Sequence, residues 1–296
     1  MHTCARYCHK RLQRECIESE ERNVCPTLLV LSDSVSESLS VLRSACRLEC
    51  GCIGRRDIGR LNTIERVDPK TIAAQETTGW QTFQLHLERY QFASRFARSG
   101  LILDMACGVG YGSHLLAQRA EPHTKIIAVD LASEALAIAR AEYTASNIEY
   151  HQADCMTFTW DAKFDAIVSL ETFEHLDEPE KFLAHLLSLL VSRGVLVLSV
   201  PITPSVDVNP YHKHDFTRDA MLRLLEKFDL RILEEMVQIQ TYNPVAMMRA
   251  RERRLQDTRK NLFGYYLQMP DKAWLRLKST IMDGFCNKYL TIAVQH

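Results

Sequence analysis

The chain has 296 residues, of which 46% are hydrophobic and 25% charged, with a formal net charge of -1 at neutral pH and a pI near 6.8. This composition is typical of a folded globular protein and excludes a wholly disordered or collagen-like chain. Because the charge is nearly balanced, no global basic field indicates nucleic acid or a membrane as the default partner. The length allows one large α/β domain with an extension.

The cysteines are concentrated near the amino terminus, since seven of the ten lie in the first 52 residues: Cys4, Cys8, Cys16, Cys25, Cys46, Cys50 and Cys52. No CxxC pair supports a zinc ribbon, although His2 and His9 leave a loose metal site with Cys4 and Cys8 open, and disulfides are the other alternative. The segment lacks the apolar stretch of a secretory signal, and no run reaches the ~18 apolar residues of a membrane span. We interpret residues 1–60 as a poorly patterned extension with reduced thiols, and we predict a cytoplasmic protein without a transmembrane segment.

After a predicted amphipathic helix at Gln84–Ala97, apolar runs of strand length alternate with helical segments through residues 61–296. The predicted strands are Leu101–Met105, Ile126–Leu131, Ile148–His151, Phe164–Leu170, Val195–Val200, Leu230–Gln238 and Tyr289–Val294. The predicted helices between them are Tyr111–Arg119, Ser133–Thr144, Pro179–Val191 and Arg218–Phe228. This alternation predicts a mostly parallel sheet covered on both faces, with residues 244–286 as a helical insertion before the last strand.

The first strand runs into a glycine-rich turn, Ala106-Cys107-Gly108-Val109-Gly110, and then into a helix. Glycines let the backbone approach a ligand closely, and the helix start presents free N–H groups. A dinucleotide would need GxGxxG here, but Ser113 replaces the third glycine and Asp104 would repel a pyrophosphate. A carboxylate at this position instead suits a ligand with an ammonium or sulfonium charge, which describes S-adenosylmethionine (SAM).

Two further acids follow the next two predicted strands. Asp130 ends the second strand, 20 residues beyond Gly110, where a carboxylate can accept hydrogen bonds from ribose hydroxyls. Asp154 follows the third strand, where it can accept from an adenine amine. Each acid alone could be a loop or cap residue. Three acids at the carboxyl ends of successive strands, together with the turn, favour a SAM site.

The segment Asp104–Gly112, with Asp130 and Asp154, resembles the successive motifs of class I SAM-dependent methyltransferases over about residues 84–240 and again at 289–294. The resemblance implies an α/β, Rossmann-like fold: a seven-stranded, mostly parallel sheet with helices on both faces and an antiparallel last strand. Ala106 stands where the family often has glycine, and Tyr90 is either a ligand contact or a core aromatic. The implied cofactor-binding residues are Tyr90, Asp104, Ala106, Gly108, Gly110, Asp130, Leu131, Asp154, Cys155 and Leu170.

A second group of polar residues follows the fourth predicted strand. On a helical turn Glu171, Glu174 and His175 share one face, and two carboxylates with an imidazole suit a divalent cation. His212, after the fifth strand, would reach the same edge of the sheet. The alternative is that these side chains only shape a substrate pocket.

The pattern Glu171-x-x-Glu174-His175 resembles that of metal-dependent O-methyltransferases, among them the ubiquinone-pathway enzymes and the small-RNA 3′-terminal 2′-O-methyltransferases. The resemblance implies Mg²⁺ at Glu171, Glu174, His175 and His212. It also implies catalytic roles for Glu174, His175 and His212, with one of the histidines as general base.

These features predict a SAM-dependent methyltransferase that O-methylates a hydroxyl of a small molecule or glycan precursor, with SAM as cofactor and Mg²⁺ as a further candidate cofactor. One alternative is a Mg²⁺-dependent RNA 3′-terminal 2′-O-methyltransferase, and another is a SAM-binding regulatory or scaffold protein without turnover. The near-neutral pI makes RNA the less favoured acceptor. The basic residues of the insertion are its main sequence support: Arg249, Arg251, Arg253, Arg254, Arg259 and Lys260.

Overall fold

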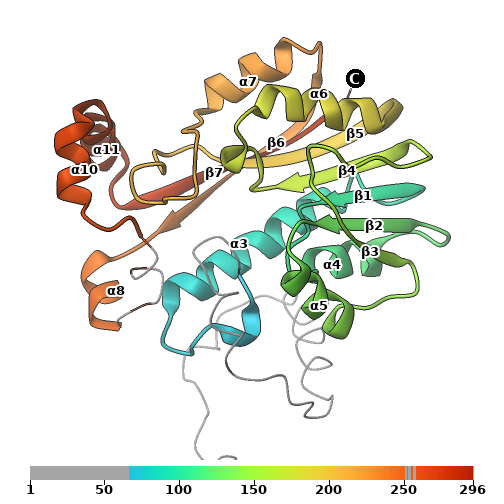
Figure 1. Ribbon diagram of the computed structural model, residues 1–296, viewed down its shortest axis with the longest axis horizontal. Coiled ribbons are helices and arrows are strands. Elements are labelled where there is room, and N and C mark those ends of the chain that lie inside the picture. Colours follow the sequence, from blue (N-terminus) through green and yellow to red (C-terminus); the bar gives the residue numbers. More distant parts are fainter. Residues whose placement is uncertain (1–66, 251, 253–254, 256–257, 296) are drawn as a thin grey trace, which may run out of the picture. The chain divides into compact units, whose positions relative to one another are not determined.

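The computed structural model describes residues 67–250, 252, 255 and 258–295 (Figure 1). The chain divides into two units, Met1–Cys52 and Ile53–His296, and every described residue lies in the second. The predicted cysteine-rich extension, with its metal and disulfide alternatives, therefore lies outside the described residues. No helix in the described part of the chain is both long and apolar enough to cross a membrane.

A seven-stranded sheet forms the centre of the fold, in the order β3-β2-β1-β4-β5-β7-β6. Strand β7 lies between β5 and β6 and runs antiparallel to both, whereas the pairs from β3 to β5 are parallel. The predicted sheet with its antiparallel last strand is confirmed. The strands are β1 (Leu101–Met105), β2 (Lys125–Asp130), β3 (Ile148–Gln152), β4 (Phe164–Leu170), β5 (Leu190–Pro201), β6 (Arg231–Thr241) and β7 (Cys286–Gln295).

Helices cover both faces of this sheet (Figure 1). On one face lie α3 (Thr77–Ala93), α4 (Tyr111–Arg119) and α5 (Ser133–Glu142), and on the other lie α6 (Pro179–Leu189) and α7 (Arg218–Glu226). The central strands are apolar along both faces because each face packs against a helical layer, as a parallel sheet requires.

Helix α3 begins at Thr77 rather than at the predicted Gln84 and ends at Ala93 rather than at Ala97. Besides Trp80 and Phe83, its first two turns hold only Thr, Gly and Gln residues, so their hydrophobic periodicity is weak. They are held by tertiary hydrogen bonds instead: the Gln240 side chain on β6 donates to the Thr78 carbonyl at 3.2 Å and to Thr82 Oγ1 at 2.9 Å.

The segment between β6 and β7 forms the predicted helical insertion, with α8 (Pro244–Ala250), α10 (Leu262–Gln268) and α11 (Pro270–Asp283). It leaves the sheet at the carboxyl end of β6 and returns at the start of the antiparallel β7. The insertion therefore lies at the edge where the parallel strands end, which is the ligand-binding edge of an open α/β sheet (Figure 1).

Helices α3 and α4 approach most closely at Gly112. A Cβ atom on Gly112 would lie 1.9 Å from Cζ of Tyr90, whose ring is only 6% exposed and has no room to move aside. Only a hydrogen fits at this position, so the contact fixes the distance between the two helices.

We expect Gly112→Ala to lower the free energy of unfolding by about 1–3 kcal/mol, because overpacking outweighs the ~1 kcal/mol by which alanine favours a helix. Urea denaturation measures the change. The control is the same substitution in a Tyr90→Leu background, where the penalty should shrink because the ring is gone. An equal penalty in both backgrounds would show that the ring is not the cause.

Candidate functional site

A cavity of about 880 Å³ opens at the carboxyl ends of β1, β2, β3 and β4. Its volume is within the range of ligand pockets and exceeds what a single small solute needs. All the predicted cofactor-binding residues except Asp104 and Gly110 line it, namely Tyr90, Ala106, Gly108, Asp130, Leu131, Asp154, Cys155 and Leu170. The structure thus brings together residues from four separate strand ends.

Gly110 shapes the cavity through the backbone rather than by lining it. It caps helix α4 in a left-handed conformation with φ 90°, and a Cβ atom there would lie 2.7 Å from the Cβ of Ala139. Ala106 also has a positive φ, 65°, although it is not glycine. The left-handed backbone at this position is the physical reason why glycine suits it, and alanine tolerates it at a cost of about 1–2 kcal/mol.

Asp104 lies beneath the cavity floor, fully buried. Its carboxylate accepts hydrogen bonds from the Tyr90 hydroxyl at 3.2 Å and from Ser113 Oγ at 2.6 Å. Burial raises the pKa of Asp104 to about 7, against the lowering effect of these two hydrogen bonds, and the negative charge of Asp130 raises it further. A cation bound in the cavity would therefore favour the ionised form of this carboxyl group.

Ser113 is a candidate site residue that sequence reasoning missed, because the glycine pattern of a dinucleotide motif points to it only as the missing third glycine. Its side chain is fully buried and makes the shortest hydrogen bond to Asp104. A polar residue three positions after Gly110, on the inner face of α4, is the signal that could have pointed to it.

The two other acids have distinct surroundings. Asp130, 7% exposed, accepts hydrogen bonds from the backbone N–H groups of Gly108 and Ala132, each at 2.8 Å. These bonds fix the carboxylate at the cavity wall and tie β2 to the glycine-rich turn. Asp154 is exposed and accepts from the Met156 N–H at 2.8 Å. Both carboxylates are thus oriented before any ligand binds.

Arg89 is a second residue that sequence reasoning missed. Its side chain is 1% exposed and lines the cavity, and the guanidinium lies over the Tyr289 ring at 4.6 Å. Its nearest carboxylate oxygen is Oε1 of Glu171, at 3.8 Å from Nη1. Among the described residues, none accepts a hydrogen bond from its guanidinium nitrogens. A buried cation with five donor hydrogens and no acceptor suits an anionic ligand group.

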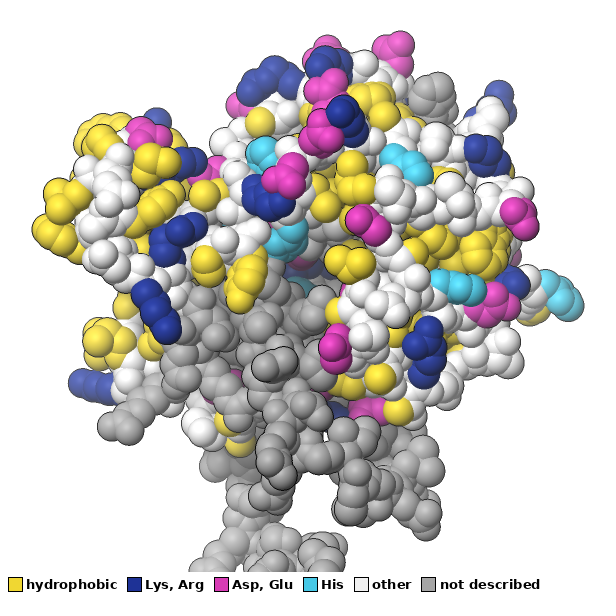
Figure 2. Space-filling model, in the orientation of Figure 1, with side chains coloured by type: hydrophobic (Ala, Val, Ile, Leu, Met, Phe, Trp, Pro, Cys, Tyr) yellow, Lys and Arg dark blue, Asp and Glu magenta, His cyan; other side chains and the backbone are white. Residues whose placement is uncertain are grey.

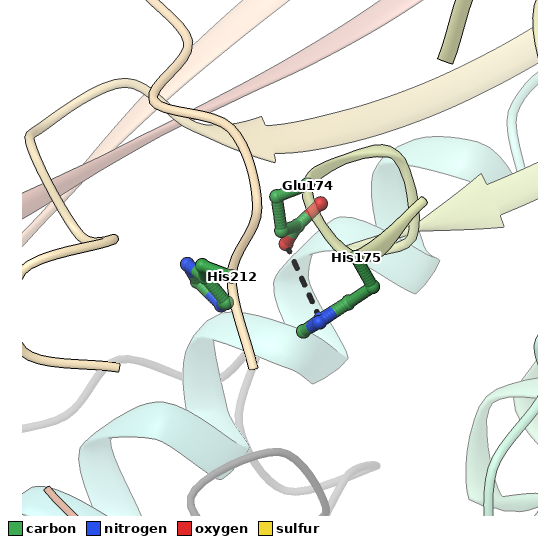
Figure 3. A group of neighbouring side chains, drawn as sticks. All are labelled: Glu174, His175 and His212. Carbon is green, nitrogen blue, oxygen red and sulfur yellow. Dashed lines mark ion pairs between the residues drawn. The ribbon is translucent and has the colours of Figure 1, made fainter. Parts of the chain in front are cut away.

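Glu174, His175 and His212 form a compact group beside the cavity (Figure 3), with one ligand atom of each lying within 4.8 Å of the others. Glu174 is fully buried, and its Oε1 lies 3.9 Å from Nε2 of His175. The rings of His175 and His212 meet edge to face, with centroids 4.8 Å apart. Of the three residues, only His175 lines the cavity.

The structure does not bring Glu171 into this group. The predicted helical turn is limited to a short 3-10 helix, η4 (Phe173–His175), and Glu171 precedes it with a φ of 51°. Its carboxylate accepts a hydrogen bond from Ser199 Oγ at 2.8 Å and faces Arg89. The predicted set of four metal ligands is therefore a group of three, with Glu171 in a separate ion pair.

His212 is held by the loop between β5 and α7, and this loop is fastened to the insertion. Nδ1 of His212 lies 2.7 Å from Ser205 Oγ, and the Ser205 N–H donates to Asp215 at 2.8 Å. Lys272 of α11 pairs with the same Asp215 at 2.6 Å. The insertion thus determines where the loop presents His212.

Comparison with known proteins finds a family match for part of the chain. Residues 102–194 match the family described as "Methyltransferase domain". A Mycobacterium tuberculosis protein named "Probable S-adenosylmethionine-dependent methyltransferase Rv3030" is 30% identical over 150 residues, which are 48% of this chain and 53% of that protein. The chain therefore spans about half the length of this curated relative.

Two shorter matches differ in the atom that their names say is methylated. A malonyl-[acyl-carrier protein] O-methyltransferase from Bacillus cereus is 32% identical over 98 residues, 33% of this chain and 36% of that protein. Phosphoethanolamine N-methyltransferase 1 from Arabidopsis thaliana is 29% identical over 119 residues, 38% of this chain and 24% of that protein.

Solved structures share the fold at low sequence identity. A protein from Bacillus halodurans C-125 has a TM-score of 0.55 at 19% identity, over 71% of this chain and 97% of that one. The YcgJ protein from Bacillus subtilis has a TM-score of 0.54 at 14% identity, over 71% of this chain and 98% of that one. Residues 102–194 are thus similar to a methyltransferase domain, and the described fold is shared with these solved structures.

Proposed function

We propose that this protein transfers the methyl group of SAM to a hydroxyl oxygen of a small molecule or glycan precursor. The observation that carries the proposal is one cavity lined by the glycine-rich turn, Asp130, Asp154 and Arg89 and also by His175. The first set suits the methyl donor, and an imidazole in the same cavity suits the removal of a proton from the acceptor.

The residues around the cavity match the chemical groups of SAM one by one. Asp130 can accept from the two ribose hydroxyls, Asp154 from the adenine amine, and Arg89 can donate to the carboxylate. Asp104 adds a negative potential beneath the sulfonium and ammonium charges. When bound, SAM supplies an electrophilic methyl group, so the protein has only to orient the acceptor and take its proton.

His175 is the best placed general base. Its Nδ1 lies 3.3 Å from the Tyr211 carbonyl, which only accepts, so Nδ1 donates and Nε2 carries the lone pair. Nε2 is also the atom nearest Glu174, whose buried carboxylate would stabilise the imidazolium formed by proton transfer. His212 lies behind His175 and is better suited to hold it in place.

A divalent cation at Glu174, His175 and His212 is the second candidate role for this group. Two imidazoles and one carboxylate suit a transition metal better than Mg²⁺, which prefers oxygen ligands. Ligand atoms up to 4.8 Å apart would also have to move closer, since two ligands at ~2.1 Å from one ion are at most ~4.2 Å apart. We therefore assign the primary role to the histidine base, with the metal as the alternative to be tested.

The surroundings of Arg259 in the basic insertion make RNA a less favoured acceptor. The Arg259 guanidinium donates to the Val206 carbonyl at 3.2 Å and stacks over the Tyr265 ring at 4.6 Å. This cation is engaged in holding the loop rather than displayed to phosphates. A regulatory or scaffold protein would bind SAM through the same cavity but would transfer no methyl group.

The test of the proposal is a labelled-methyl screen over small-molecule, glycan-precursor and RNA pools. We expect transfer to a hydroxyl compound, with His175→Ala lowering kcat by about 10²- to 10⁴-fold because the base is lost. EDTA should leave the rate unchanged. Loss of activity in EDTA with recovery on added Mn²⁺ or Mg²⁺ would establish the metal role instead, and SAM binding without transfer to any pool would favour the scaffold.

Arg89→Met should weaken SAM binding by about 10- to 100-fold, because a charge-assisted hydrogen bond contributes about 1.5–3 kcal/mol. Calorimetry with SAM and decarboxylated SAM separates this role from a structural one. The wild type should lose affinity when the carboxylate is removed, whereas Arg89→Met should bind both ligands equally. If the variant still prefers SAM, Arg89 does not bind the carboxylate; Arg89→Lys, which keeps the charge, is the control.

SAM affinity should rise as the pH increases from about 5 to 8, because the pKa of Asp104 is near 7 in the free protein and a cationic ligand favours its ionised form. Calorimetry in buffers of different ionisation enthalpy should show proton release on binding. The raised pKa of Asp104 also makes the stability of the unliganded protein depend on pH. The contribution of the neutral carboxyl group to the free energy of unfolding is fully present below the unfolded pKa near 3.8, and it is lost as the pH rises through about 7. Asp104→Asn should remove both dependences, and an unchanged profile in that variant would contradict the assignment.

A further inference from the structure

The helices α10 and α11 carry large hydrophobic side chains that are exposed to solvent. Exposure reaches 75% for Phe263, 65% for Trp274, 72% for Ile281 and 74% for Met282. Figure 2 shows hydrophobic side chains gathered over α10 and α11, at the upper left, with Lys and Arg side chains beside them. We call this surface the hairpin face; it comprises Phe263, Leu267, Trp274, Leu277, Ile281, Met282 and Phe285.

The outward orientation of the hairpin face is fixed from behind. Arg276 pairs with the buried Asp207 at 2.6 Å, and Lys272 pairs with Asp215 at 2.6 Å. At 100° per residue, both cations lie on the side of α11 opposite Trp274 and Ile281. The helix is therefore anchored by its polar side, and its apolar side is left without a packing partner among the described residues. Apolar surfaces of this extent usually mark a binding site.

Lys278 indicates what the hairpin face binds. It lies four residues after Trp274 and three before Ile281, in the middle of the apolar surface. Its side chain is exposed and pairs with no carboxylate in the described part of the chain. Burial in a dry protein interface would leave this charge without a partner, which is costly. At a lipid surface its aliphatic chain can follow the apolar residues while the ammonium reaches the phosphates.

A second exposed helix of the insertion has the same combination of side chains. On α8, Val245 and Met248 are 55% and 69% exposed, and Arg249 beside them is also exposed. Lys260, before α10, is exposed as well. Aliphatic and aromatic side chains accompanied by cations are the composition of an interfacial membrane-binding surface.

We propose that the hairpin face docks this protein on an anionic lipid surface, with Trp274, Ile281 and Met282 entering the headgroup region and Lys278 pairing with lipid phosphate. The insertion lies at the same edge of the sheet as the cavity, and its anchor residues Lys272 and Arg276 hold the loop that carries His212. The proposal concerns binding and does not depend on methyl transfer.

Co-sedimentation of the full chain with vesicles tests this proposal without SAM. We expect binding to vesicles that mix phosphatidylcholine with phosphatidylglycerol and weaker binding to phosphatidylcholine alone. Ile281→Glu should reduce partition by about tenfold or more, since it removes apolar burial and adds a repelled charge. Lys278→Ser should reduce it by about fivefold on the anionic vesicles only. Tryptophan emission should shift to shorter wavelength on binding, and this shift should be lost in Trp274→Phe.

Ile232→Glu is the matched control, because Ile232 is an exposed apolar residue (42%) near the start of β6, at the opposite end of that strand from the insertion. It should bind vesicles as the wild type does. The proposal fails if the wild type does not bind anionic vesicles, or if Ile281→Glu and Ile232→Glu behave alike. It also fails if sedimentation velocity shows a dimer that Ile281→Glu dissociates, since the hairpin face would then bind a second copy of the chain.

Discussion

The burial of the Asp104 carboxylate is the constraint on which the rest of the site depends. A carboxylate with no exposed surface needs donors, and the two that supply them come from different helices, Tyr90 from α3 and Ser113 from α4. These bonds fasten both helices to the end of β1. The Tyr90 ring must then lie against Gly112, which explains why a position inside a helix has no side chain. The buried Asp104 carboxylate thus fixes the floor of the cavity and the positions of α3 and α4.

A second buried acid, Asp207, is 1% exposed and lies in the loop between β5 and α7, which contributes Tyr211 and Lys213 to the cavity lining. It accepts from Tyr266 at 2.6 Å and from both Arg276 Nε and Nη2, so the loop between β5 and α7 is held from the insertion. Breaking such a pair leaves an uncompensated buried charge, which is far more costly than losing an exposed salt bridge. The insertion therefore holds a loop that lines the cavity, and it also carries an exposed apolar surface.

Much of the fold could be predicted because strand–helix alternation and the carboxyl ends of strands are local signals. The glycine-rich turn, Asp130 and Asp154 were found in this way, since each follows an apolar run. Arg89 and Ser113 were missed because their importance comes from burial, which no local pattern shows. Glu171 was grouped with Glu174 and His175 on ideal helical spacing, whereas the backbone takes a positive φ at Glu171 and turns its side chain to Ser199.

The position of Glu171 follows from the electrostatics of Arg89. Among the described residues, Glu171 is the carboxylate that pairs with this buried guanidinium, and moving it toward His175 would leave Arg89 without an anion in a low-dielectric site. An unpaired buried guanidinium costs several kcal/mol of stability. A weakly bound, exposed metal ion beside His175 would not offset that cost. Glu171 could leave Arg89 only when another anion takes its place, and the carboxylate of SAM is an anion of that kind. Any metal role of Glu171 would therefore require the methyl donor to bind first.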